Sequence, residues 1–126
     1  MDFKNLGVII VDHGSRVNTS NLMFEDFILR FKDEFSYPIV QAAHMELASP
    51  TIGDAFTACC QQEAKEIVVV PYFFMPGKHI QKDIPDLCEK ASVDNGNIPF
   101  RISGPLGQHP LMKSILVDQI QSVVDA

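Results

Sequence analysis

Two short runs of mostly β-branched residues constrain the fold of this chain more than any other feature of its sequence. Val8–Val11 and Ile67–Val70 are apolar without interruption. Runs of this length and composition are typical of strands that are buried on both faces of a parallel sheet. Four strands are predicted in all: Leu6–Val11, Ile39–Met45, a segment of Glu66–Phe74 that ends at Pro71 or soon after, and Ile98–Ser103, where Pro99 suits an edge.

Apolar residues at helical spacing separate the predicted strands. The first helix carries a stripe at i, i+3, i+4, i+7 and i+11, namely Phe24, Phe27, Ile28, Phe31 and Phe35. The second is expected to start with Ser49 as N-cap and Pro50 in first position, and to turn Ile52, Ala55, Phe56 and Cys59 inward. The third is expected around Ile84, Leu87, Cys88 and Ala91, with Pro85 in its first turn. The last opens at Pro110 and has an inner face of Leu116, Ile120, Val123 and Val124.

This alternation of strand and helix predicts one domain over residues 1–126, built as three α/β/α layers around a four-stranded parallel sheet. Ligands of such sheets bind beyond the carboxyl ends of the strands. The loops that follow the four strands are therefore where a functional site is expected.

Charge, hydropathy and cysteine spacing exclude several classes of protein. The net charge is −6 and no basic run occurs, so a nucleic-acid partner is not expected. No apolar run approaches the roughly 20 residues of a membrane helix, and the first residues lack the pattern of a signal peptide. We expect a cytoplasmic location, or an organelle stroma if a transit peptide has been removed. The three cysteines form no Cys-x-x-Cys pair, and Cys59 is expected to be a small buried hydrophobe.

All four histidines fall in or next to the predicted strand-end loops. They are His13, His44, His79 and His109. Imidazole binds borderline divalent metals and moves protons near neutral pH. The distribution therefore indicates metal or proton chemistry at one edge of the sheet.

Two of these loops have further features. In the first, Gly14 permits a tight turn, and Ser15 and Arg16 can contact an anion. A generic anion-binding turn with a solvent-facing histidine is the alternative. The third loop runs through an apolar stretch to Lys78 and His79, which suits a flat apolar ligand with acidic edges; the alternative is an ordinary hydrophobic crossover.

Four blocks of the sequence, in order, resemble motifs of the small, single-domain sirohydrochlorin and cobalt chelatases, the class II tetrapyrrole chelatases. The blocks are Val8–Arg16, Ala43–Ile52, Val70–Pro85, and Gly104–Gly107 with His109-Pro110. The resemblance implies a chelatase-like half domain with strand order 2-1-3-4 that works as a homodimer. It also implies two metal-handling histidines, which map onto His13 and His79. No permanently bound cofactor is implied, since Fe²⁺, Co²⁺ or Ni²⁺ would be a substrate.

The implied reaction is the insertion of Fe²⁺ or Co²⁺ into sirohydrochlorin or a related tetrapyrrole, in siroheme- or cobalamin-type biosynthesis. Two pyrrole protons must leave the centre of the macrocycle, and a desolvated cation must enter it. A neutral imidazole can accept a proton or bind the incoming metal, so it can serve both steps. Glu46 could accept a proton or complete a transient metal shell, or it could be a surface carboxylate. Ser15, Arg16, Lys78 and Lys82 could bind the eight carboxylates of the macrocycle, and Arg101 is a weaker candidate.

Some assignments stay open at this point. His44 is either a supporting partner of the site or a strand-end residue that faces solvent, and His109 is a loop residue before the last helix. A non-catalytic tetrapyrrole- or metal-binding module is the alternative function, and a metal-storage or metal-delivery protein is a third. The dimer surfaces expected are the Tyr72–Met75 loop and the last helix with Ile115, Leu116 and Val117.

Overall fold

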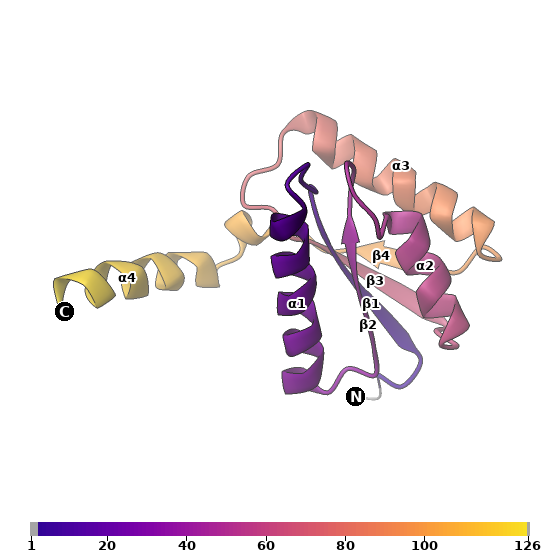
Figure 1. Ribbon diagram of the computed structural model, residues 1–126, viewed down its shortest axis with the longest axis horizontal. Helices are drawn as coiled ribbons and strands as arrows, with labels where there is room; N and C mark the ends of the chain where they lie inside the picture. Colours follow the sequence, from indigo (N-terminus) through magenta and orange to yellow (C-terminus); the bar gives the residue numbers. More distant parts are fainter. Residues whose placement is uncertain (1–2, 126) are drawn as a thin grey trace.

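The computed structural model describes residues 3–125 and shows a parallel sheet flanked by helices (Figure 1). The strands are β1 (Leu6–Asp12), β2 (Ile39–His44), β3 (Glu66–Pro71) and β4 (Phe100–Ile102). The helices are α1 (Asn18–Phe35), α2 (Ile52–Gln61), α3 (Lys78–Asp94) and α4 (Leu111–Val124), with a short 3₁₀ turn η1 (Leu106–Gln108) before α4. The strand order is β2-β1-β3-β4 and every pairing is parallel, so the predicted α/β class and strand order are confirmed.

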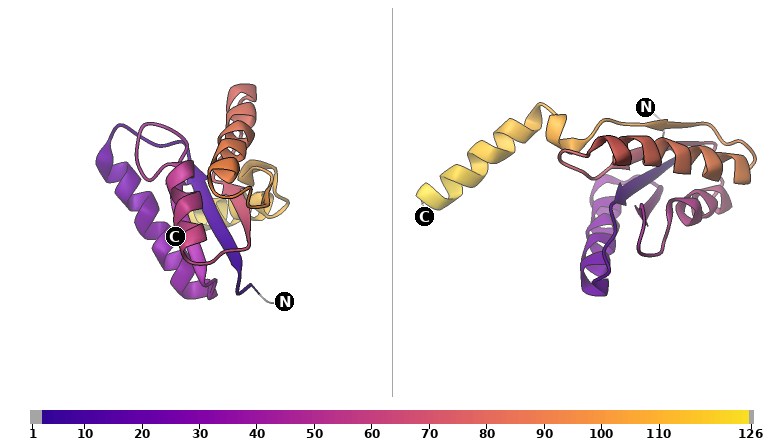
Figure 2. Two further views of the ribbon diagram at one scale, coloured as in Figure 1. Left: turned by 90° about the vertical axis from the view of Figure 1, so that its right-hand side faces the viewer. Right: turned by 90° about the horizontal axis from the view of Figure 1, so that it is seen from above.

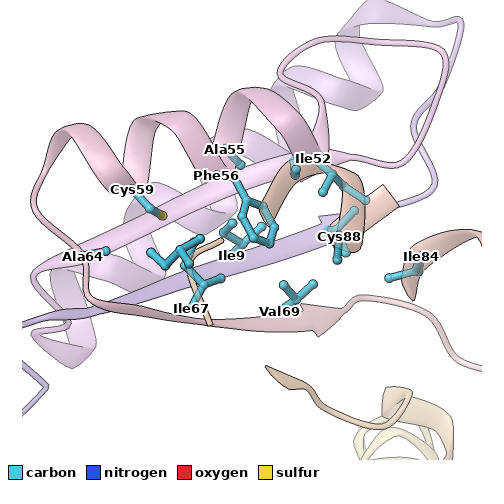
Figure 3. Packing of buried hydrophobic residues seen from close by; sticks show 14 of the residues in the cluster. Ile9, Ile52, Ala55, Phe56, Cys59, Ala64, Ile67, Val69, Ile84 and Cys88 are labelled. Carbon is cyan, nitrogen blue, oxygen red and sulfur yellow. The ribbon is translucent and has the colours of Figure 1, made fainter. Parts of the chain in front are cut away.

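The two faces of the sheet carry separate hydrophobic clusters, because successive strand residues point in opposite directions. Ile9 and Val11 pack with α2 and α3 in the larger cluster, whereas Val8 and Ile10 pack with α1. Figure 3 shows Phe56 of α2 lying over the strands at the centre of the larger cluster. These layers place the carboxyl ends of β1, β2 and β3 at one edge of the sheet.

The buried cysteines behave as apolar side chains. Cys59 and Cys88 are fully buried, and burial raises the pKa of each thiol to about 12 because the thiolate would lose its hydration. The expectation that Cys59 is a small core hydrophobe is confirmed.

Two helix starts differ from the predicted ones. α2 is capped by Thr51, not Ser49, because the Thr51 hydroxyl accepts from the Asp54 amide while the Asp54 carboxylate accepts from the Thr51 amide. α3 begins at Lys78, so Pro85 lies inside the helix and not in its first turn. Pro85 has no N–H, so the carbonyl four residues earlier lacks its usual helical donor.

Helix α1 buries only part of its predicted stripe. Phe24 and Ile28 are buried, whereas Phe27 and Phe35 are 45% and 61% exposed. The stripe is therefore wider than the surface of the sheet that α1 covers.

The prediction of an inner face on α4 is wrong. Figure 2 shows α4 extending away from the rest of the domain, and α4 has no buried residue. The side chains expected to face the core are 58–77% exposed, namely Leu116, Ile120, Val123 and Val124. Apolar spacing identifies a helix face that needs cover but does not say which surface supplies it.

Within residues 3–125, no helix is long and apolar enough to cross a membrane.

Candidate functional site

The loops after β1 and β2 are joined by backbone hydrogen bonds that extend the pairing of the two strands. The Met45 amide donates to the Asp12 carbonyl at 2.8 Å, and the Glu46 amide donates to the His13 carbonyl at 3.1 Å. Gly14 has φ +92°, and a Cβ there would lie 1.9 Å from the Glu46 carbonyl oxygen. Only glycine fits this close approach, which sets the His13 side chain beside that of Glu46.

His13 and Glu46 form a half-exposed imidazole–carboxylate pair. The imidazole Nε2 lies 3.0 Å from Glu46 Oε1, and Nδ1 lies 3.2 Å from the Gly14 carbonyl oxygen. Both ring nitrogens thus face oxygen atoms. His13 can offer a lone pair to a metal only when one of these contacts opens.

His79 forms a second imidazole–carboxylate pair, with Asp83. Its Nε2 lies 2.9 Å from Asp83 Oδ2, one turn further along α3, and the His79 side chain is 88% exposed. Its Nδ1 makes no hydrogen bond to another residue in the described part of the chain, so this nitrogen is available to a ligand. Sequence reasoning missed Asp83 because the segment was expected to be a loop, whereas i, i+4 spacing on a helix would have paired the two residues.

The carboxylate partners of both histidines line one hollow, which we call the acidic hollow. Its volume is about 320 Å³, and its lining is Met45, Glu46, Asp83, Asp86 and Leu87. The structure therefore brings the loop after β2 and the first turns of α3 to a common cavity. Among residues 3–125, no group of three or more His, Cys, Asp or Glu side chains lies close enough to hold a metal ion, so the donors meet as pairs.

Ser15 has a structural role in the turn before α1. The buried Asn21 side chain accepts from the Ser15 amide at 2.9 Å and donates to the Ser15 carbonyl at 2.8 Å. The Ser15 hydroxyl accepts from the Val17 amide at 3.0 Å and keeps its own proton to donate. Asn21, which was not singled out from the sequence, holds this loop in place.

The candidate cations differ in their surroundings. Arg16 and Lys78 are exposed and form no ion pair with any residue of the described chain, whereas Lys82 pairs with Asp86 at 3.4 Å. Arg101 pairs with Glu66 at 3.6 Å, and Glu66 is the first residue of β3. Arg101 is thus held toward the amino end of β3, away from the strand-end loops, which weakens its candidacy further.

His44 is fully buried between two carboxylates. Its Nδ1 lies 2.6 Å from Asp12 Oδ1 and its Nε2 lies 2.8 Å from Glu25 Oε2. Burial by itself lowers the pKa of His44, but hydrogen bonds to Glu25 and Asp12 outweigh burial and raise that pKa. The solvent-facing interpretation of His44 is therefore wrong. His109, in contrast, lies in the loop before α4, where its Nδ1 accepts from the Leu111 amide at 3.1 Å.

This chain is an α/β domain that carries imidazole–carboxylate pairs at the carboxyl edge of a parallel sheet. Residues 7–123 match the model of the CbiX family, and the chain belongs to that family. The chelatase family resemblance inferred from the four sequence blocks is confirmed.

Three comparisons illustrate the relationship. The chain is 51% identical over 115 residues to the chloroplastic sirohydrochlorin ferrochelatase of Arabidopsis thaliana. The aligned residues cover 91% of this chain and 51% of the relative. It is 25% identical over 129 residues to the sirohydrochlorin cobaltochelatase of Methanococcoides burtonii, covering 96% and 98% of the two chains. It superposes with a TM-score of 0.82 and 27% identity on the sirohydrochlorin chelatase SirB from Bacillus subtilis subspecies spizizenii in complex with cobalt, covering 94% of this chain and 51% of that one. The chain thus spans about half the length of the Arabidopsis relative but nearly all of the Methanococcoides relative.

Proposed function

We propose that this chain inserts Fe²⁺ or Co²⁺ into sirohydrochlorin. The observation that carries the proposal is the meeting of two imidazole–carboxylate pairs, His13–Glu46 and His79–Asp83, whose carboxylates line the acidic hollow. The ferrochelatase and cobaltochelatase names of the relatives support the same reaction and both metals.

The two pairs divide the chemistry of metal delivery. Carboxylate oxygens of Glu46 and Asp83 attract a hydrated divalent cation to the hollow. His79 offers its free Nδ1, and His13 offers a nitrogen once its contact with Glu46 opens. Because the donors form no closed cage, the cation keeps exchangeable positions, and exchange from protein to pyrrole nitrogens is the reaction itself.

The same residues can remove the pyrrole protons. A neutral imidazole accepts a proton, and a carboxylate at hydrogen-bond distance stabilises the imidazolium that results. In this scheme Glu46 serves His13 and Asp83 serves His79, which is supported by the 3.0 Å and 2.9 Å separations within the two pairs.

Binding of the macrocycle requires apolar surface and cations. Phe74 and Met75, in the loop before α3, are 62% and 74% exposed and offer a surface for a flat conjugated ring. Arg16, Lys78 and Lys82 supply charges for its carboxylates, and the Ser15 hydroxyl supplies a donor. The metal is a substrate in this scheme, and Ni²⁺ is a third candidate because such donors discriminate poorly among these ions.

The chloroplastic name of the Arabidopsis relative supports a stromal location.

Turnover by His13→Ala and His79→Ala variants tests the proposal directly. Metal-free sirohydrochlorin and Fe²⁺ or Co²⁺ are mixed with catalytic amounts of protein, and the visible spectrum is followed. Each variant should lose about 10²- to 10⁴-fold in rate, the usual contribution of a positioned acid–base group, with an unchanged circular dichroism spectrum. His109→Ala is the matched control and should keep the wild-type rate, since the His109 ring accepts from the Leu111 amide and is not a member of either imidazole–carboxylate pair.

Two results would contradict the assignment. Near-normal rates in both site variants would remove these histidines from the reaction. A wild-type spectral shift that saturates at one macrocycle per chain without turnover would identify a binding module and not an enzyme.

A further inference from the structure

Leu47, in the loop after β2, has a backbone conformation that leucine rarely adopts. Its φ is +71°, in the left-handed region, where the Cβ of an L-residue approaches the following carbonyl oxygen. In residues 3–125 the other non-glycine residues with positive φ each lie just beyond the end of a helix, where this conformation commonly stops the helix; they are Ser36, Glu63 and Asn97. Leu47 follows a strand instead, so helix termination does not account for it.

A reversal of the chain accounts for the positive φ but not for a leucine. The Glu46 amide donates to the His13 carbonyl at 3.1 Å, so the chain runs beside the loop after β1 as far as Glu46. The His44 amide donates to the Pro50 carbonyl at 2.8 Å, so by Pro50 the chain has returned to the end of β2. Leu47 lies between these two bonds. A glycine would make the same reversal without strain.

Packing within the described chain does not account for the leucine side chain either. Leu47 is 50% exposed and belongs to neither hydrophobic cluster of the sheet. Strained non-glycine residues concentrate at ligand-binding sites, where a ligand makes use of the side chain that the strained backbone presents. The apolar side chain of Leu47 therefore points to a contact with a ligand.

The strand order places Leu47 on one side of His13 and other exposed apolar residues on the opposite side. β1 lies between β2 and β3, so the loop with His13 lies between the loop with Leu47 and the loop with Phe74 and Met75. Figure 1 shows the loops after β1 and β2 and the start of α3 at the same end of the domain. Neighbouring strands are about 5 Å apart, so the flanking strands are about 10 Å apart. A ligand that touches both sides must be broad and apolar.

We propose that Leu47 is a specificity-determining residue that packs against the tetrapyrrole ring on the β2 side of His13, while Phe74 and Met75 contact the ring on the β3 side. This inference rests on the proposed function, because it takes the macrocycle as the ligand. The ring then lies across His13. Apolar contacts on two sides favour an extended conjugated ring over a small anion that the same cations could bind.

Titration of metal-free sirohydrochlorin into the protein, followed by the visible spectrum, tests the proposal. Leu47→Asn is similar in size and adopts positive φ more readily than leucine, but it is polar. Its dissociation constant should rise about tenfold, because a half-exposed apolar side chain can contribute about half the value of its full burial. Leu47→Met stays apolar and should bind like the wild type. Val93→Asn is the matched control, since Val93 is 55% exposed but lies near the C-terminal end of α3.

Further measurements separate a contact with the macrocycle from a disturbance of the loop. Leu47→Asn should keep the wild-type midpoint of urea unfolding, because relief of the backbone strain offsets the apolar contacts that are lost. It should also keep the KM for Co²⁺, because Glu46 is unchanged. The fold-change in macrocycle binding should be the same at low and high salt, since no charge is removed. If the Asn variant does not fold, Leu47→Gly makes the same test, because glycine adopts this φ freely.

The results that would overturn this inference differ from those that would overturn the proposed function. If Leu47→Asn binds the macrocycle as tightly as the wild type, Leu47 is not a contact, although the chain can still be a chelatase. The same conclusion follows if its KM for Co²⁺ rises as much as its dissociation constant for the macrocycle. If the wild type binds no macrocycle at all, the proposed function fails and the assignment of Leu47 fails with it.

Discussion

At the scale of single residues, the two site histidines differ in how their ring nitrogens are occupied. His13 is held at both nitrogens, by Glu46 and by the Gly14 carbonyl, whereas His79 is held at Nε2 alone. In the proposed reaction, His79 therefore receives the metal without rearrangement. In the same scheme His13 first loses its contact with Glu46, and the Glu46 carboxylate that is freed can then accept a pyrrole proton.

Replacing the carboxylate partners should distinguish them from an ordinary acidic patch. Glu46→Gln and Asp83→Asn keep the size of each side chain but remove its charge, and loss of such a supporting partner typically costs about 10- to 100-fold in metal affinity or activity. Asp86→Asn is the control, since Asp86 lines the same hollow but pairs with Lys82. Steady-state rates measure the difference. If Asp86→Asn were as damaging as the other two, total negative charge and not histidine pairing would be the important property.

At the scale of elements, His44 connects three parts of the fold. The side chain comes from the end of β2, Asp12 from the end of β1, and Glu25 from α1. A buried cation between two carboxylates is stabilising only while it is charged, because both ring nitrogens donate only in the imidazolium form. The bond to Asp12 also fixes the residue that precedes His13.

The stability of the protein should depend on the charge of His44. Its folded-state pKa is raised above the ordinary 6.5, so its contribution is complete below about pH 6.5 and is lost as pH rises through the higher folded value. The free energy of unfolding, measured by urea titration from about pH 6 to 9, should therefore fall with rising pH. His44→Gln should be less stable at pH 6 and should show a shallower fall. An identical pH slope in the variant would contradict a charged His44 in the native state.

At the scale of the whole molecule, the net charge of −6 has to be reconciled with a polyanionic macrocycle. Arg16 and Lys78 are exposed, unpaired within the described residues, and placed at the strand-end loops. Local cations govern the approach of an anion more than the total charge does, and salt screens them over about 10 Å at 0.1 M.

Removing these cations should weaken macrocycle binding without changing the chemistry. Arg16→Ala and Lys78→Ala should each raise the KM for sirohydrochlorin by about fivefold at low salt, the upper range for an exposed pair, and leave kcat nearly unchanged. Their KM should also depend less on salt concentration than that of the wild type. Lys65→Ala is the control, because Lys65 precedes β3 at the opposite end of the sheet. Equal effects of Lys65→Ala would indicate a diffuse field and not a binding site.

Local patterns in the sequence determined the strands, their parallel arrangement and the edge where the site lies. Uninterrupted β-branched runs are typical of strands in a parallel sheet that lies between layers of helices, and the carboxyl ends of parallel strands share one edge. The family blocks further pointed to His13 and His79, and the chemistry of metal insertion pointed to Glu46, but the roles of all three in catalysis stay predictions.

Contacts between segments distant in the sequence were decided by the tertiary structure alone. The ion pairs of His44 with Asp12 and Glu25 join residues 32 and 19 positions apart, and no periodicity encodes them. Asp83 pairs with His79 because α3 begins at Lys78, seven residues before Pro85, which puts both side chains one helical turn apart. The apolar stripe of α4 could be predicted from the spacing of its residues. The surface that this stripe covers could not be predicted, because the direction of α4 is set by its connection to η1 and not by the sequence of the helix.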